Sequence, residues 1–74
     1  MKTFYILPDL DLLRYYSKMR RKIGPNPKKV YYADSESEAR AQFKRQLIIW
    51  GLPASAAEDV AESASCEDYS DVDM

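Results

Sequence analysis

Residues 30–53 read VYYADSESEARAQFKRQLIIWGLP, and this stretch decides the fold that the sequence predicts. Ser35 and Glu38 have the spacing of a capping box, in which the serine oxygen accepts a first-turn amide and the glutamate reaches back. Apolar residues then recur along one helix face, at Ala39, Phe43, Leu47 and Trp50. The pattern predicts an amphipathic helix that begins after Ser35.

The end of this helix is marked as clearly as its start. Gly51 suits the left-handed residue that closes a helix, and Leu52 is placed to fold back near Leu47. Pro53 cannot continue the helix because it lacks the amide hydrogen. We therefore expect the helix to stop at Gly51.

Two strands are expected upstream of this helix. Residues 3–7 (TFYIL) are aromatic and β-branched, and Pro8 stops them. Residues 28–33 (KKVYYA) have the same character. Because side chains alternate along a strand, one of Tyr31 and Tyr32 should point inward and the other outward.

The segment between these strands fits a second amphipathic helix over residues 9–23. Asp9 is a good N-cap, and residues 20–22 (RRK) place cations in the last turn, where they favour the helix dipole. Gly24 then occupies the expected C-cap position, before Pro25. Apolar residues follow one helix face at Leu12, Tyr16, Met19 and Ile23.

A β-hairpin is the alternative for this region, because residues 15–32 (YYSKMRRKIGPNPKKVYY) are nearly mirror-symmetric. Pairing Tyr16 with Tyr31 would put Lys18 opposite Lys29, and facing like charges destabilise a ladder. The same pairing gathers several apolar side chains on one face. The helix is favoured because its start, stripe, end charges and stop agree, and the hairpin stays open as an alternative.

Residues 54–74 carry weaker signals. Ser55 and Glu58 repeat the capping-box spacing. Small apolar residues form a stripe at Ala57, Val60, Ala61 and Ala64. This pattern indicates a short helix, or a segment that folds only on a partner. Residues 65–74 (SCEDYSDVDM) are acidic and lack apolar surface, so we expect them to be disordered.

Together these elements predict an α+β protein. Residues 1–53 form one small domain, in which two short strands and two amphipathic helices make two packed layers. Residues 54–74 form an acidic appendage, a weak helix followed by a disordered tail. The expected core residues are Leu7, Leu13, Tyr16, Met19, Val30, Phe43, Leu47 and Trp50.

The net charge of −1 hides an uneven distribution along the 74 residues. All eleven Lys and Arg residues lie in residues 1–50, whereas residues 51–74 hold seven carboxylates and no base. Such asymmetry is typical of an interaction tail. No stretch approaches the ~20 apolar residues that a membrane span needs, and no signal peptide is recognisable. We expect a soluble, monomeric, cytoplasmic protein that does not contact a membrane.

Few residues are available for catalysis. The chain has no histidine, and its single cysteine, Cys66, has no activating neighbour. Its two glycines, Gly24 and Gly51, both have helix-cap explanations, so no phosphate-binding loop is expected. The carboxylates of the tail lack the turn glycine of a calcium loop. We expect no catalytic residue, no cofactor and no metal site.

The basic cluster around the Gly-Pro-Asn-Pro loop is the candidate binding surface. In the helical interpretation, Arg14, Lys18 and Arg21 share one face, roughly opposite the apolar stripe. Outward tyrosines beside cations are frequent in protein interfaces. A solvated charged face is the plain alternative. The candidate partner-binding residues are Arg14, Lys18, Arg20, Arg21, Lys22, Lys28, Lys29, Tyr15 and Tyr31.

Residues 1–29 (MKTFYILPDLDLLRYYSKMRRKIGPNPKK), the small size and the acidic tail together resemble small phage-encoded regulators of host transcription, such as those of lytic Xanthomonas phages. The resemblance lies in the layout and assigns no residue. It implies a non-enzymatic protein that binds the large subunits of bacterial RNA polymerase. Such a protein would inhibit initiation by displacing the σ factor and would suppress termination.

Two other functions stay open. An acidic phage protein would mimic DNA and inhibit a host nuclease or restriction system. A basic hairpin would instead enter a DNA groove as a small DNA-binding domain. The seven carboxylates of residues 51–74 oppose contact with phosphates, so we expect no binding to duplex DNA.

Overall fold

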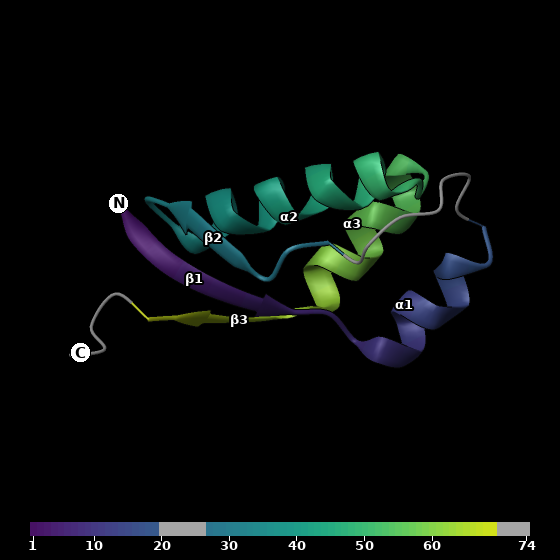
Figure 1. Ribbon diagram of the computed structural model, residues 1–74, viewed down its shortest axis with the longest axis horizontal. Coiled ribbons are helices and arrows are strands. Elements are labelled where there is room, and N and C mark those ends of the chain that lie inside the picture. Colours follow the sequence, from purple (N-terminus) through teal and green to yellow (C-terminus); the bar gives the residue numbers. More distant parts are fainter. Residues whose placement is uncertain (20–26, 70–74) are drawn as a thin grey trace.

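The computed structural model describes residues 1–19 and 27–69, which form three helices and a three-stranded sheet (Figure 1). The elements are, in chain order, β1 (Lys2–Leu7), α1 (Leu10–Ser17), β2 (Val30–Ala33), α2 (Glu36–Trp50), α3 (Ala54–Ser63) and β3 (Ser65–Asp68). The expected α+β class is confirmed. No helix in these two ranges is long and apolar enough to cross a membrane.

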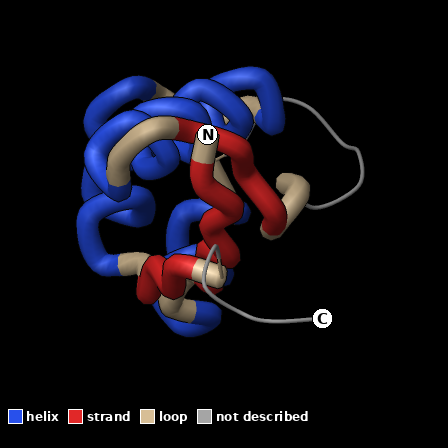
Figure 2. Tube along the Cα trace, turned by 90° about the vertical axis from the view of Figure 1, so that its left-hand side faces the viewer, coloured by secondary structure: helices blue, strands red, loops and turns tan. Residues whose placement is uncertain are grey.

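The sheet is antiparallel, with strand order β2-β1-β3. Phe4 in the central strand lies opposite Tyr31 in β2 and opposite Asp68 in β3. Helix α2 packs against one face of the sheet, and α3 packs against α2 and α1; Figure 2 shows the arrangement from the end of the molecule. One buried cluster joins the sheet to α2 and α3, and its largest fully buried side chains are Tyr31, Phe43, Ile6, Leu47 and Val60.

The caps of α2 confirm the prediction made from residues 34–53. The backbone amide of Glu38 donates to Ser35 Oγ at 3.2 Å, and Glu38 Oε2 accepts from the Asp34 amide at 3.0 Å. At the other end Gly51 has φ 119°, and the Leu52 amide donates back to the Leu47 carbonyl at 3.1 Å. A residue with a Cβ would be strained at this φ, so glycine is required there.

Helix α1 is shorter than the predicted helix over residues 9–23. Asp9 is the N-cap as expected, since its Oδ1 accepts from the Asp11 amide at 3.0 Å. The helix ends at Ser17, whose hydroxyl donates to the Arg14 carbonyl at 2.7 Å and so competes with the helical backbone. Residues 20–26, including the predicted last turn and its glycine cap, lie outside the described residues.

The hairpin alternative for residues 15–32 is wrong. Tyr16 lies in α1, and the strand partner of Tyr31 is Phe4 in β1. Strand β1 therefore occupies the pairing edge that the hairpin would have used.

Helix α3 is a full part of the core. The predicted stripe of Ala57, Val60, Ala61 and Ala64 is buried. The second capping box is wrong, because the helix begins at Ala54 after Pro53 and has no side-chain cap. Glu58 instead lies 3.9 Å from Lys44 Nζ in α2, as an ion pair.

The expectation of disorder is wrong for residues 65–68, which form β3 and pair with β1. The backbone of a strand can satisfy its hydrogen bonds on a sheet edge whatever the polarity of its side chains. Cys66 also packs against the core, and Asp68 forms an ion pair with Lys2 at 3.9 Å. Residues 54–69 therefore share the core of residues 1–53 and do not form a separate appendage. Residues 70–74 lie outside the described residues.

The expected core is right for α2 and wrong for the two strands. Phe43, Leu47 and Trp50 are buried, and Leu13 and Tyr16 are half-buried. Three expected core residues are exposed, with exposed fractions of 41% for Leu7, 38% for Val30 and 52% for Met19. In both strands the neighbouring residues fill the core: Phe4, Ile6, Tyr31 and Ala33. Met19 lies beyond the end of α1, where no helix face carries it inward.

The end of α3 is held by Arg40, a residue of α2. Its Nη1 donates to the carbonyl oxygens of Ala61 and Ala64, both at 2.7 Å, and lies 3.3 Å from the Glu62 carbonyl. Its Nε also lies 3.6 Å from Glu36. The last carbonyls of a helix have no intrahelical partner, so a cation at this point satisfies them and complements the helix dipole.

We predict that Arg40→Met lowers the free energy of unfolding by about 2–3 kcal/mol, because charged hydrogen bonds to half-buried carbonyls are lost. Arg45→Met is the control, since Arg45 lies exposed on the same helix and its removal should cost under ~0.5 kcal/mol. Urea unfolding followed by circular dichroism measures both variants. Equal losses would contradict the role assigned to Arg40.

Candidate protein-binding surface

Helix α1 packs more loosely than the rest of the molecule. None of its residues is buried, and it reaches the core only through half-buried Leu12, Leu13 and Tyr16. The Tyr16 hydroxyl donates to Asp59 Oδ2 of α3 at 2.8 Å, and this bond, followed by partial burial, raises the pKa of Tyr16. The helix is thus tied to α3 while its outer side stays open.

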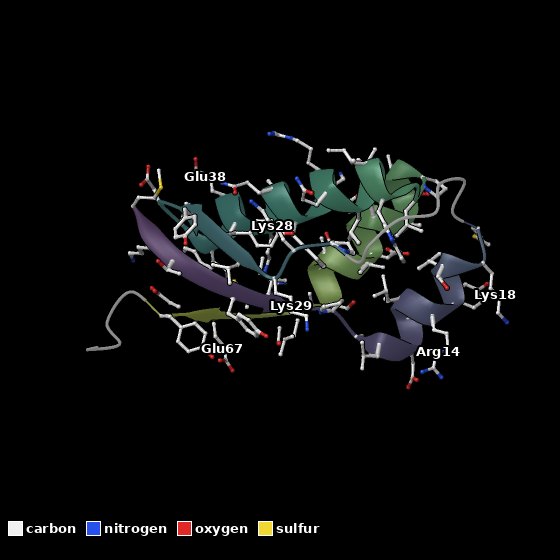
Figure 3. All side chains as sticks on the ribbon, in the orientation of Figure 1. Arg14, Lys18, Lys28, Lys29, Glu38 and Glu67 are labelled. Atoms are coloured by element: carbon white, nitrogen blue, oxygen red, sulfur yellow. The ribbon has the colours of Figure 1, made fainter. Side chains whose placement is uncertain are left out.

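The predicted basic residues on the described part of the chain lie at α1 and just before β2. Arg14 is exposed on α1 and Lys18 at its C-cap, whereas Lys28 and Lys29 are exposed just before β2, nearer the middle of the molecule (Figure 3). In the same view Glu38 and Glu67 lie farther toward the end opposite α1. Arg20, Arg21 and Lys22, also predicted to bind, lie outside the described residues.

These four cations differ in their pairing from Lys2, Arg40 and Lys44, each of which forms an ion pair with a carboxylate at 3.6–3.9 Å. Arg45, exposed on α2, is the other described cation without an ion pair among the described residues. Arg14, Lys18, Lys28 and Lys29 form no ion pair with any described residue. They are available to an acidic partner without breaking a native ion pair.

The two tyrosines predicted to bind a partner have opposite environments. Tyr15 has an exposed fraction of 60% and packs edge-on against Tyr16, with ring centroids 5.2 Å apart. Tyr31 is fully buried, so its assignment as a binding residue is wrong. Its hydroxyl donates to the Lys28 carbonyl at 2.8 Å, and the Lys28 Nζ lies 5.0 Å from its ring centroid. The buried Tyr31 therefore contacts both the backbone and the side chain of Lys28. We use the term basic surface for Arg14, Tyr15, Lys18, Lys28 and Lys29.

An apolar hollow of about 270 Å³ adjoins the basic surface and was missed in the sequence. It is lined by Leu7, Pro8, Leu10, Leu13, Pro27, Lys29 and Phe43. The hollow lies where the end of β1 meets the start of α1, beside the approach to β2. Its one sequence signal was Leu10, an apolar residue off the helical stripe, which is 68% exposed.

A second missed feature is the face of the sheet turned away from the helices. Tyr5 packs edge-on against Tyr69 there, with ring centroids 5.9 Å apart, and Tyr32 is 57% exposed. Tyr31 and Tyr32 thus point to opposite faces, as strand alternation predicted. The Tyr69 hydroxyl donates to Glu67 at 2.6 Å, and this bond raises the pKa of Tyr69. The Glu67 carboxylate beside Tyr69 makes this face less suited to an acidic partner than the basic surface.

The remaining groups that could react or bind a metal are the Cys66 thiol and the carboxylates. Burial, followed by the charge of Glu36, raises the pKa of the Cys66 thiol, which disfavours the nucleophilic thiolate. No group of three or more carboxylates or thiols within residues 1–19 and 27–69 is placed to hold a metal ion.

Comparison with known proteins adds no assignment: no family model, curated protein or solved structure matches this chain.

The buried Tyr31 predicts a loss of stability at high pH. Burial raises its pKa to about 12 from 10.0, so between these values the folded state keeps a proton that the unfolded chain releases. Stability from this group is full below pH 10 and falls as pH rises toward 12, by at most about 1.4 kcal/mol per unit.

Tyr31→Phe removes the titrating group and keeps the ring. We expect the unfolding free energy of the wild type to fall by roughly 2 kcal/mol more than that of Tyr31→Phe across this window. Urea unfolding at a series of pH values measures both, and lysine titration affects the two chains alike. Parallel pH profiles would contradict the assignment.

Proposed function

We propose that this chain is a non-catalytic binding protein that docks on another protein through its basic surface. The observation that carries the proposal is the set of four exposed cations without ion-pair partners among the described residues, at a loosely packed helix and just before β2. Charge complementarity of this kind speeds encounter with an acidic surface and selects the partner. Tyr15, exposed among these cations, supplies the aromatic contact that protein interfaces favour.

The partner that we propose is bacterial RNA polymerase, contacted at its large subunits in the cytoplasm of a host cell. The support for this partner is the layout-level resemblance of residues 1–29 and the acidic C-terminal segment to phage-encoded transcription regulators. On this proposal the protein inhibits initiation by displacing the σ factor and suppresses termination by the elongating enzyme. It acts as a monomer and needs no cofactor.

The test is capture of polymerase from a bacterial lysate by the tagged chain, repeated with purified polymerase. The variant Arg14→Glu/Lys18→Glu reverses two charges of the basic surface. We expect it to lower capture at least tenfold at low salt, because two attractive contacts become repulsive. Raising the salt concentration should weaken the wild type more than this variant.

The matched control is Arg45→Glu, which is compared with the single variant Arg14→Glu. It makes the same change in net charge at an exposed cation of α2 that has no ion pair among the described residues. Circular dichroism checks that both variants stay folded. Equal loss of capture in both would show that net charge matters and the basic surface does not. Recovery of a nuclease complex in place of polymerase would favour DNA mimicry.

A further inference from the structure

The apolar hollow adjoins both pairs of unpaired cations, because α1 and Lys29 each contribute to its lining. Lys29 belongs to the hollow and to the cations, since it lines the hollow and is exposed. Leu10 and Leu13 place the hollow at the first turns of α1. A ligand that enters this hollow therefore meets both apolar side chains and positive charge.

The geometry of α1 extends the positive charge away from the hollow. Leu10, Arg14 and Lys18 follow one another at intervals of four residues. Residues at this spacing lie on one helix face, each one turn beyond the last. Lys18 caps the end of the helix and lies just beyond its last turn. A row of two cations thus begins at the rim of the hollow, and Lys28 and Lys29 lie on its other side.

Three described carboxylates lie on or beside α1, and they do not cancel this charge. Asp9 accepts hydrogen bonds from the amides of Asp11 and Leu12 as the helix cap. Asp11 is exposed in the first turn, and Asp59 of α3 accepts from the Tyr16 hydroxyl. The four cations outnumber these three carboxylates.

The size of the hollow limits what fills it. Pockets for drug-sized ligands span about 300–1,000 Å³, and this hollow of about 270 Å³ is smaller. It suits a single large apolar side chain, which is how a protein interface commonly anchors itself. Phe43, which is 1% exposed, lies at the base of the hollow and gives that side chain an apolar contact.

We infer that this hollow receives one apolar anchor side chain from an acidic segment of a partner protein, whose carboxylates lie against Arg14, Lys18, Lys28 and Lys29. The inference rests on the proposed function and gives the partner's chemistry. A single-stranded nucleic acid is the other polyanion to consider. Its phosphates would lie on the cations, but its bases stack on exposed aromatic rings, and the aromatic residue that lines this hollow, Phe43, is only 1% exposed.

The experiment uses three short fluorescent peptides and the full chain. The first is acidic with one central leucine, the second has serine in place of the leucine, and the third has amides in place of the carboxylates. We expect the first to bind about tenfold more tightly than the second, since burying a leucine is worth roughly 1.5 kcal/mol or more. It should also bind several-fold more tightly than the third at low salt, a gap that salt closes.

Two variants separate the contribution of the apolar anchor from that of the carboxylates. Leu10→Ser should abolish the preference for leucine over serine and keep the preference for the acidic peptide. Lys29→Glu should reduce the preference for carboxylates over amides and keep the preference for leucine. The controls are Ile49→Ser and Arg45→Glu, which change an exposed apolar residue and an exposed cation on α2. Both controls should bind the three peptides as the wild type does.

Several results would overturn the inference: equal binding of the leucine and serine peptides, a loss of leucine preference in Ile49→Ser as large as in Leu10→Ser, or tighter binding of a single-stranded oligonucleotide than of the acidic leucine peptide. Polymerase capture is measured in parallel. Capture without any leucine preference overturns the inference and leaves the proposed function standing. A leucine preference without capture supports the hollow and overturns polymerase as the partner.

Discussion

The bonds from the Arg40 guanidinium to the last carbonyls of α3 are the contact on which the C-terminal third of the fold depends. They satisfy the open end of that helix inside the molecule and let the chain turn at once into β3. Without a donor at this point, half-buried carbonyls would have no partner at the junction of α2, α3 and the sheet. One side chain of α2 thus joins a helix and a strand that begin far from it in the sequence.

Strand β3 in turn gives β1 partners on both edges, which places the strand that carries buried Phe4 and Ile6 at the centre of the sheet. The acidic character of β3 fits its position at the edge. Its charged residues face solvent or pair with Lys2, and edge charges discourage pairing with another chain. The same segment that carries negative charge therefore also completes the fold.

The sequence predicted the parts of this structure that depend on local hydrogen bonds. The caps at Asp9, Ser35 and Gly51 each involve residues within five positions, and all three were found. Arg40 reaches 21–24 residues along the chain, and no local pattern marks such a contact. The prediction of which strand residues face the core failed for a related reason. TFYIL and VYYA are apolar at consecutive positions, so alternation alone does not say which side of each strand faces the core.

The candidate site shows the same division. Charge and spacing located Arg14, Lys18, Lys28 and Lys29, because charged side chains stay at the surface whatever the packing. They could not locate the hollow, which exists only because β1, α1 and the approach to β2 converge. Helix α1 buries none of its residues fully, so it contributes little to the core and keeps its cations and Leu10 exposed. A helix held mainly by half-buried leucines and the Tyr16–Asp59 bond is a low-stability element, and binding surfaces are drawn from such elements.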